Sequence, residues 1–214
     1  MQFDFDTMSS AARFAFLTGA VVPRPIALIT TLTPQGGCNA APYTFFSIAG
    51  TEPPVVTVTV LPTPDGRMKD TGANILHTKE FVVNLVSEDL AAAMNLTCID
   101  APAGIDELAL AGLAPAPSVK IKAPRIERSP ISLECVLHTT VPLSPNQLII
   151  VGRIVQAHAR DDIVQDAREP VLDTNAMHLI GGMHGAKWYT RTSDLFAMDR
   201  PTWANWLREG NAKS

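Results

Sequence analysis

Apolar and polar residues alternate along several short segments of the chain. Within residues 56–60, valines alternate with threonines, and a repeat of two residues places the two kinds of side chain on opposite faces of a β-strand. Residues 131–141 and 148–157 are the two longest strand candidates, and a Ser-Pro-Asn turn separates them. Further strands are predicted at residues 26–32, 38–42, 55–61 and 81–86, the first two as a hairpin around a turn that contains Gly36 and Gly37.

Helical patterns are short and lie outside these segments. Seventeen prolines punctuate the chain, which limits the length of any helix. The predicted helices are residues 8–17 with an end at Gly19, a helix that starts near Asp70, residues 89–96, a brief turn at 106–113, and residues 201–207. The pattern therefore predicts a mainly β fold with peripheral helices, in which the strands form an antiparallel barrel that closes on itself.

Length and charge narrow the class of protein. A chain of 214 residues suits one domain, predicted here as residues 1–214 with a C-terminal helical tail at 199–214. The net charge of -4 is spread along the chain without a block of like charge, which argues against a nucleic-acid or membrane-surface partner. The acidic start of the chain and the lack of a long apolar run predict a cytoplasmic protein.

Several familiar sites are not encoded in the sequence. The three cysteines and five histidines lack the spacing of metal ligands, so we predict no metal site and expect the cysteines to be reduced and mostly buried. No Gly-x-Gly-x-x-Gly, phosphate-loop or Gly-x-Ser-x-Gly motif is present. A dinucleotide would therefore have to dock without a Rossmann domain, and a serine hydrolase is disfavoured.

Residues 38–47 are the first candidate site. Small residues would let a planar ligand approach the backbone, and Asn39, Thr44 and Ser47 could meet the polar edge of a heterocycle. The alternative is a bent strand that uses Phe45 and Phe46 as core residues.

Two further segments combine cations with small residues. Residues 67–74 place Arg67, Lys69 and a threonine at a predicted helix start, where backbone N–H groups could bind a phosphate; Asp70 instead favours simple helix capping. Residues 181–191 could fold over a ligand through their aromatic and cationic side chains, or form a surface turn followed by a strand.

The order and spacing of several motifs together resemble one family, the flavin reductase-like FMN-binding split-barrel proteins. The similar segments span most of the chain, and Tyr189 and Arg191 match a Tyr-x-Arg pattern that follows a glycine-containing loop in the family. Residues 177–182 depart from the family's usual pattern, so no role is assigned to His178 or His184. The segments that carry the resemblance are residues 22–31, 39–46, 53–54, 69–71 with Asn74, 81–84, 103–107, 111–113, 129–130 with 134–135, and 151–155 with His158.

The resemblance implies a split β-barrel of antiparallel, Greek-key type and a homodimer with FMN at or near the subunit interface. The FMN phosphate is expected near the helix start at residues 69–71, and the flavin ring along a strand at residues 39–47. No catalytic residue is identified. The expected FMN-binding residues are Asn39, Ala40, Ala41, Thr44, Phe45, Phe46, Ser47, Arg67, Lys69, Asp70, Thr71, Asn74, Tyr189 and Arg191.

Three functions follow from this reading. The first is an NAD(P)H:flavin oxidoreductase that passes hydride from NADH or NADPH to FMN, which then serves a partner oxygenase or another acceptor. The second is an FMN-binding electron carrier that does not meet a nicotinamide directly. The third is a split barrel without flavin that acts as a binding module.

Overall fold

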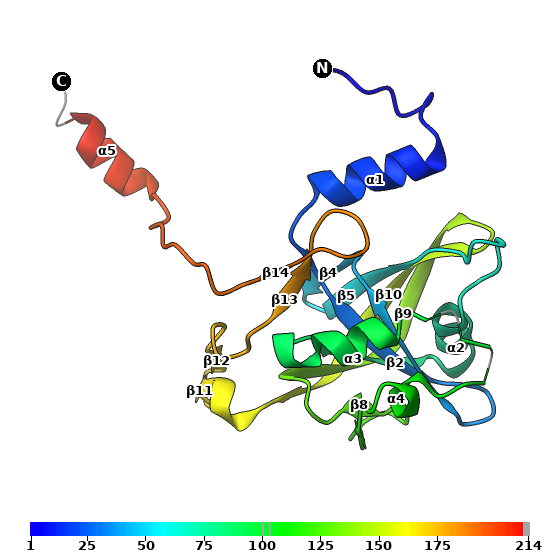
Figure 1. Ribbon diagram of the computed structural model, residues 1–214. Coiled ribbons are helices and arrows are strands. Elements are labelled where there is room, and N and C mark those ends of the chain that lie inside the picture. The colour runs from blue at the N-terminus through cyan, green and yellow to red at the C-terminus, as the bar shows by residue number, and fades with distance from the viewer. Residues whose placement is uncertain (100, 103, 212–214) are drawn as a thin grey trace.

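Seven antiparallel strands form the main sheet of the computed structural model, which describes residues 1–99, 101–102 and 104–211 (Figure 1). Their order is β3-β2-β6-β9-β10-β5-β4, so β5 pairs with β10, which lies far from it in the chain. This non-sequential order confirms the prediction of a mainly β, antiparallel split barrel. The strands are β2 (Ala27–Leu32), β3 (Cys38–Tyr43), β4 (Phe46–Thr51), β5 (Pro54–Val60), β6 (Glu80–Leu85), β9 (Ile131–Ser144) and β10 (Gln147–Ala159).

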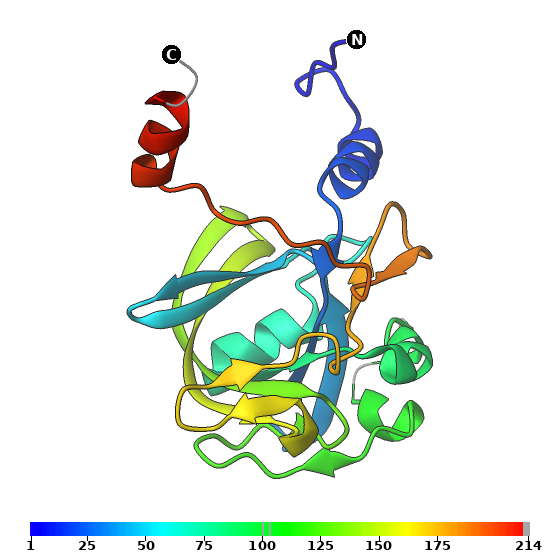
Figure 2. The same cartoon turned by 90° about the vertical axis from the view of Figure 1, so that its left-hand side faces the viewer.

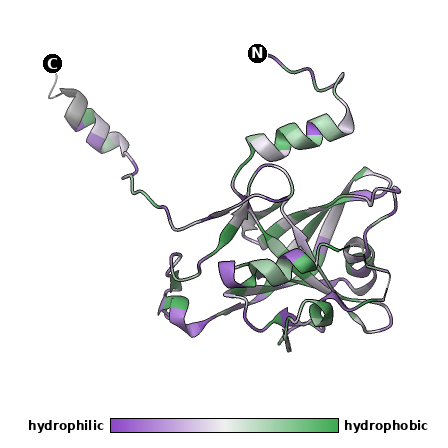
Figure 3. Ribbon diagram, viewed as in Figure 1, coloured by the Kyte–Doolittle hydropathy of each residue, from purple (hydrophilic) through white to green (hydrophobic). Residues whose placement is uncertain are grey.

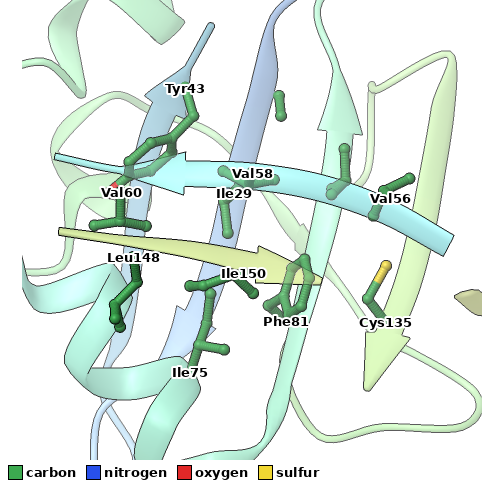
Figure 4. Close-up of a cluster of buried hydrophobic side chains, with 12 residues drawn as sticks. Ile29, Tyr43, Val56, Val58, Val60, Ile75, Phe81, Cys135, Leu148 and Ile150 are labelled. Atoms are coloured by element: carbon green, nitrogen blue, oxygen red, sulfur yellow. The ribbon is translucent and has the colours of Figure 1, made fainter. Parts of the chain in front are cut away.

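The strand β2 is buried on both faces. Ala27 and Ile29 pack into the barrel core, which Figure 4 shows between strands from opposite sides of the barrel. Leu28 points the other way, into a second cluster that includes Leu90, Met94 and other residues beside the sheet. Because both faces are buried, the sequence of β2 is a nearly continuous apolar run, whereas apolar and polar residues alternate in β5.

Close packing inside the barrel requires a glycine in β10. A Cβ atom on Gly152 would lie 2.3 Å from Cζ of Phe81, far inside van der Waals contact. Phe81 is fully buried, so its ring occupies the space that a side chain at position 152 would need.

Residues 39–47 do not form one strand, contrary to the prediction. The strand β3 ends at Tyr43 and β4 begins at Phe46, because the chain changes partner there. The strand β3 pairs with β2, whereas β4 pairs with β5. The two strands are therefore the opposite edges of the seven-stranded sheet, and residues 44–45 cross the split between them.

Short strands and helices surround the barrel. A second sheet has the order β1-β13-β14, and two smaller pairs are β7 with β8 and β11 with β12. The helices include the predicted helix starting at Asp70, α2. The helices α1 and α5 begin two residues later than the predicted residues 8–17 and 201–207 and end beyond them. Their bounds are α1 (Ser10–Ala20), α2 (Asp70–Thr78), α3 (Ala91–Leu96), α4 (Glu107–Leu110), α5 (Trp203–Asn211), β1 (Arg24–Pro25), β7 (Pro115–Ala116), β8 (Arg125–Ile126), β11 (Val164–Asp166), β12 (Val171–Leu172), β13 (Ile180–Gly182) and β14 (Tyr189–Arg191).

Two arms, residues 1–22 and 193–211, leave the barrel on the same side, as two perpendicular views show (Figures 1 and 2). The helix α1 carries apolar stretches (Figure 3), and it meets the barrel at its C-terminal end, where Arg24 of β1 donates to the Thr18 carbonyl. Phe14 and Leu17 are 48% and 44% exposed, and Trp203 and Trp206 of α5 stack on each other with ring centroids 4.9 Å apart. Both arms thus present apolar side chains to solvent in the single chain.

Candidate functional site

Four segments that are distant in sequence surround a polar cleft of about 570 Å³. The cleft is bordered by β3, by the loop that leads into α2, by the segment after α3 and by the first residue of α4. This volume is typical of a cofactor-sized site. The lining residues are Asn39, Ala40, Ala41, Pro42, Tyr43, Thr63, Pro64, Asp65, Arg67, Lys69, Asp70, Thr71, Thr97, Cys98, Ile99, Ala101, Pro102 and Glu107.

Two buried asparagines attach α2 to the β2–β3 hairpin. Nδ2 of Asn39 donates to Oγ1 of Thr71 at 3.0 Å, and Nδ2 of Asn74 donates to Oγ1 of Thr31 at 3.0 Å. All four side chains are buried, where amide–hydroxyl bonds are poorly replaced by water. The two sequence segments predicted to meet at the site therefore do converge in space.

The start of α2 is open to a ligand. Lys69 is the N-cap residue and makes no side-chain capping bond; the backbone N–H of Ala73 is the donor to its carbonyl, at 3.1 Å. The N–H groups of the first helical turn before Ala73 have no partner within the helix and carry partial positive charge. The Thr71 oxygen accepts from Asn39, and the Thr71 side chain is also close enough to the Tyr43 phenol to lower the pKa of that group.

The free edge of β3 forms one wall of the cleft. Oε2 of Glu107 accepts a hydrogen bond from the Ala40 backbone N–H at 3.1 Å, so this N–H points away from β2. Two residues on, an outward N–H is absent because position 42 is a proline, which suits an edge strand. The side chains of Ala40 and Ala41 on this wall are short, which leaves room for a flat ligand near the backbone.

Charges of both signs line the cleft. Nε of Arg67 lies 2.6 Å from Oδ2 of Asp65, and hydrogen bonds from Thr63 and Arg67 lower the pKa of Asp65 to about 2. Arg67 is thus already paired. Lys69 forms no ion pair with any residue that the structure describes, and its charge opposes the rise that burial causes in the pKa of the nearby Cys98 thiol.

Seven of the predicted FMN-binding residues line this cleft, and seven do not. Asn74 is in the buried link to Thr31 described above. Oγ1 of Thr44 accepts from Nε of Arg24 at 3.3 Å, and the Phe45 ring lies 6.2 Å from that of Phe14 in α1. The predicted residues that line the cleft are Asn39, Ala40, Ala41, Arg67, Lys69, Asp70 and Thr71.

Phe46 and Ser47 line a separate apolar groove of about 440 Å³, beside β1, β13 and the end of β6. The two predicted residues in β14, Tyr189 and Arg191, line neither the cleft nor the groove. Nε of Arg191 donates to Oε2 of Glu88 at 2.7 Å. Burial raises the pKa of the Tyr189 phenol, and the nearby cleft residue Cys98 adds to the effect.

Eleven of the eighteen cleft residues were not among the predicted ones, and Glu107, Tyr43, Thr97 and Cys98 are four of these. Glu107 lies in one of the segments that resemble the family, but it was not assigned a role. Tyr43 lies in the first candidate segment but was not assigned a role. Thr97 and Cys98 follow a short helix that carries no recognisable motif. Cys98 is exposed and Cys38 is partly exposed, so the prediction of mostly buried cysteines is wrong, and only Cys135 is buried.

Among the residues that the structure describes, no cluster of three or more His, Cys, Asp or Glu side chains has the geometry to hold a metal ion. Within the same part of the chain, no helix is long and apolar enough to cross a membrane.

Comparisons with known proteins agree with this architecture. A family model described as flavin reductase like domain matches residues 19–178. An uncharacterized protein of Deinococcus radiodurans is 40% identical over 215 residues, covering 99% of this chain and 94% of that protein.

Two solved structures are also similar over nearly their whole length. The 2-nitrobenzoate 2-nitroreductase of Pseudomonas fluorescens has a TM-score of 0.87 and 32% identity, covering 95% of this chain and 98% of that chain. Nitrilotriacetate monooxygenase component B of Bacillus cereus has a TM-score of 0.87 and 29% identity, covering 92% of this chain and 98% of that chain.

The partly buried carboxylate of Glu107 predicts a pH dependence of stability. Burial is the largest influence on it and raises its pKa, with Asp70 and Asp106 adding to the effect. Stability from this group is therefore complete below the unfolded-state pKa of about 4.3 and is lost as pH rises through the higher folded-state pKa. Glu107→Gln should increase the free energy of unfolding relative to the native chain more at pH 7 than at pH 4.

Urea denaturation at the two pH values measures this difference. Glu127→Gln, which changes an exposed carboxylate outside the cleft, is the matched control and should show no such gain. Identical pH dependence in the native chain and Glu107→Gln would contradict the argument.

Proposed function

Because the chain belongs to the flavin reductase-like family, we propose that it binds FMN in the polar cleft and reduces it with NADH or NADPH. The observation that carries this proposal is the convergence of β3 with the start of α2 through the bond between Asn39 and Thr71. One border of the cleft can hold a phosphate and the adjoining border can accept a flat ring.

The donors at the helix start fit a phosphate group. The N–H groups of the first turn of α2, the Thr71 hydroxyl and the unpaired Lys69 together offer dipolar, neutral and charged donors. Asp70 and Glu107 work against an anion, so Lys69 must supply the compensating charge. In this arrangement Asn39 orients Thr71 and does not itself contact the ligand through its amide nitrogen.

The β3 edge would hold the ring. Its alanines permit close approach to the backbone, and Glu107 keeps the Ala40 N–H satisfied. When bound, the flavin supplies the hydride-accepting atom, so the protein needs no acid–base triad. The role of the chain is to hold one ring face and leave the other accessible to a nicotinamide.

The similar proteins suggest two classes of electron acceptor. The Bacillus cereus protein is a component of a monooxygenase, and the Pseudomonas fluorescens protein is named as a nitroreductase. We propose a partner oxygenase or a small reducible acceptor for this chain. An FMN-binding electron carrier that does not react with nicotinamides is the alternative.

Anaerobic mixing distinguishes these functions. The FMN-loaded protein should lose its flavin absorbance near 450 nm within seconds of adding NADH or NADPH, on the order of the turnover of typical enzymes. Bleaching by dithionite but by neither nicotinamide would support the electron carrier. A colourless protein that takes up no FMN would refute both.

The phosphate contact gives a second prediction. Lys69→Glu removes a charge-assisted contact and adds repulsion, so it should weaken FMN binding by about 2 kcal/mol, roughly 30-fold in Kd. Lys120→Glu makes the same charge change outside the cleft and should leave the Kd unchanged within about twofold. Equal effects of the two variants on a calorimetric titration would place the phosphate elsewhere.

We also propose a homodimer in which the arms pack on a second copy. The arms carry exposed apolar side chains, and the roots of both arms, at Pro23 and Thr192, border the apolar groove. In a two-fold dimer, an arm that reaches a partner's groove receives the partner's arm in return. Phe196 and Met198, which are 86% and 82% exposed, are suited to such a contact.

Loss of the aromatic pair on α5 should weaken this dimer. Trp203→Ser combined with Trp206→Ser should raise the dimer dissociation constant at least about tenfold, because buried tryptophans often dominate interfaces. Asn205→Ser in the same helix is the control. Light scattering over a dilution series measures the mass; a native chain that is monomeric throughout would refute the dimer, and an unaltered constant would exclude α5 from it.

A further inference from the structure

Tyr43 has the one buried side-chain nitrogen or oxygen without a hydrogen-bond partner in the part of the chain that the structure describes. The residue is 7% exposed, and its ring packs in the barrel core (Figure 4). A phenylalanine would fill the same space without a hydroxyl. An unpaired buried hydroxyl is costly to a folded protein, so its presence needs an explanation.

Tyr43 borders the polar cleft, and its phenol is close to Asp70, Glu107 and Thr71. Burial is the main reason that the pKa of Tyr43 is raised to about 12; the nearby Thr71 side chain opposes the rise, and the two carboxylates add to it. The hydroxyl is therefore protonated throughout the neutral range and can act as a donor.

The first turn of α2 lies close to the same phenol. It has no side-chain cap, and Asp70 and Thr71 within it are near the Tyr43 hydroxyl. The Tyr43 hydroxyl adds a donor from the core side of the helix start. An uncharged donor forms no ion pair with the nearby carboxylates, so it remains suited to an anionic ligand with several acceptor atoms.

We propose that the Tyr43 hydroxyl donates a hydrogen bond to the phosphate of the bound flavin and makes the cleft select phosphorylated flavin over riboflavin. This inference rests on the proposed function, since it assumes a flavin in the cleft. In this role the Tyr43 hydroxyl destabilises the ligand-free protein and stabilises the complex with the flavin.

The test is Tyr43→Phe, with three measurements on the full chain: Kd for FMN, Kd for riboflavin, and the ligand-free unfolding midpoint in urea. We expect the Kd for FMN to rise about tenfold, as for loss of one hydrogen bond to a charged group, and that for riboflavin to change less than twofold. The ligand-free midpoint should stay the same or rise, because the variant removes an unpaired buried hydroxyl.

Ser129→Ala is the matched control. Its hydroxyl is also buried, but it is paired, with Oγ 2.8 Å from the Leu85 carbonyl oxygen and 2.7 Å from that of Ile131. This variant should lower the unfolding midpoint and leave the ratio of the two flavin affinities unchanged, which is the opposite pattern from Tyr43→Phe.

The outcomes separate this inference from the proposed function. If the native chain binds FMN and Tyr43→Phe changes both flavin affinities equally, changes neither, or lowers the ligand-free midpoint, the role of Tyr43 is refuted while flavin binding stands. If the native chain binds neither flavin, the proposed function fails. Inorganic phosphate is then the probe: it should raise the unfolding midpoint of the native chain more than that of Tyr43→Phe, and equal shifts would refute the donor role.

Discussion

The buried hydrogen bond between Asn39 and Thr71 is the interaction on which the site depends. It joins an edge strand to the first turn of a helix, and the parallel bond between Asn74 and Thr31 prevents the helix from rotating about that contact. Because both bonds are shielded from water, breaking either leaves a buried polar group unpaired. The helix start is thereby held against the strand edge at a distance set by short side chains.

The split of the barrel explains why a cleft exists there. The chain crosses from β3 to β4 without the two strands pairing, so β3 keeps a free edge along the cleft. An open edge is usually a liability. Here Glu107 and Pro42 remove the unpaired backbone donors from it, and the remaining edge is available to a ligand.

The cleft balances a phosphate site against nearby acids. Arg67 is neutralised by Asp65, and the Glu107 carboxylate is partly desolvated, so its charged form is disfavoured. Lys69 and the dipole of α2 are left as the main attraction for an anion. A neutral hydroxyl such as that of Tyr43 adds hydrogen bonding at such a place without adding charge.

The sequence by itself determined the strand-rich, antiparallel character of the chain, the start of α2 and the two segments that border the cleft, since alternation, turns and helix starts are local properties. It did not predict the break between β3 and β4, because that depends on which distant strand each one pairs with. Nor did it predict Glu107 and Cys98 in the cleft, or the unpaired hydroxyl of Tyr43. Only the tertiary structure decided these, because the partner of a buried polar group is supplied by segments remote in the chain.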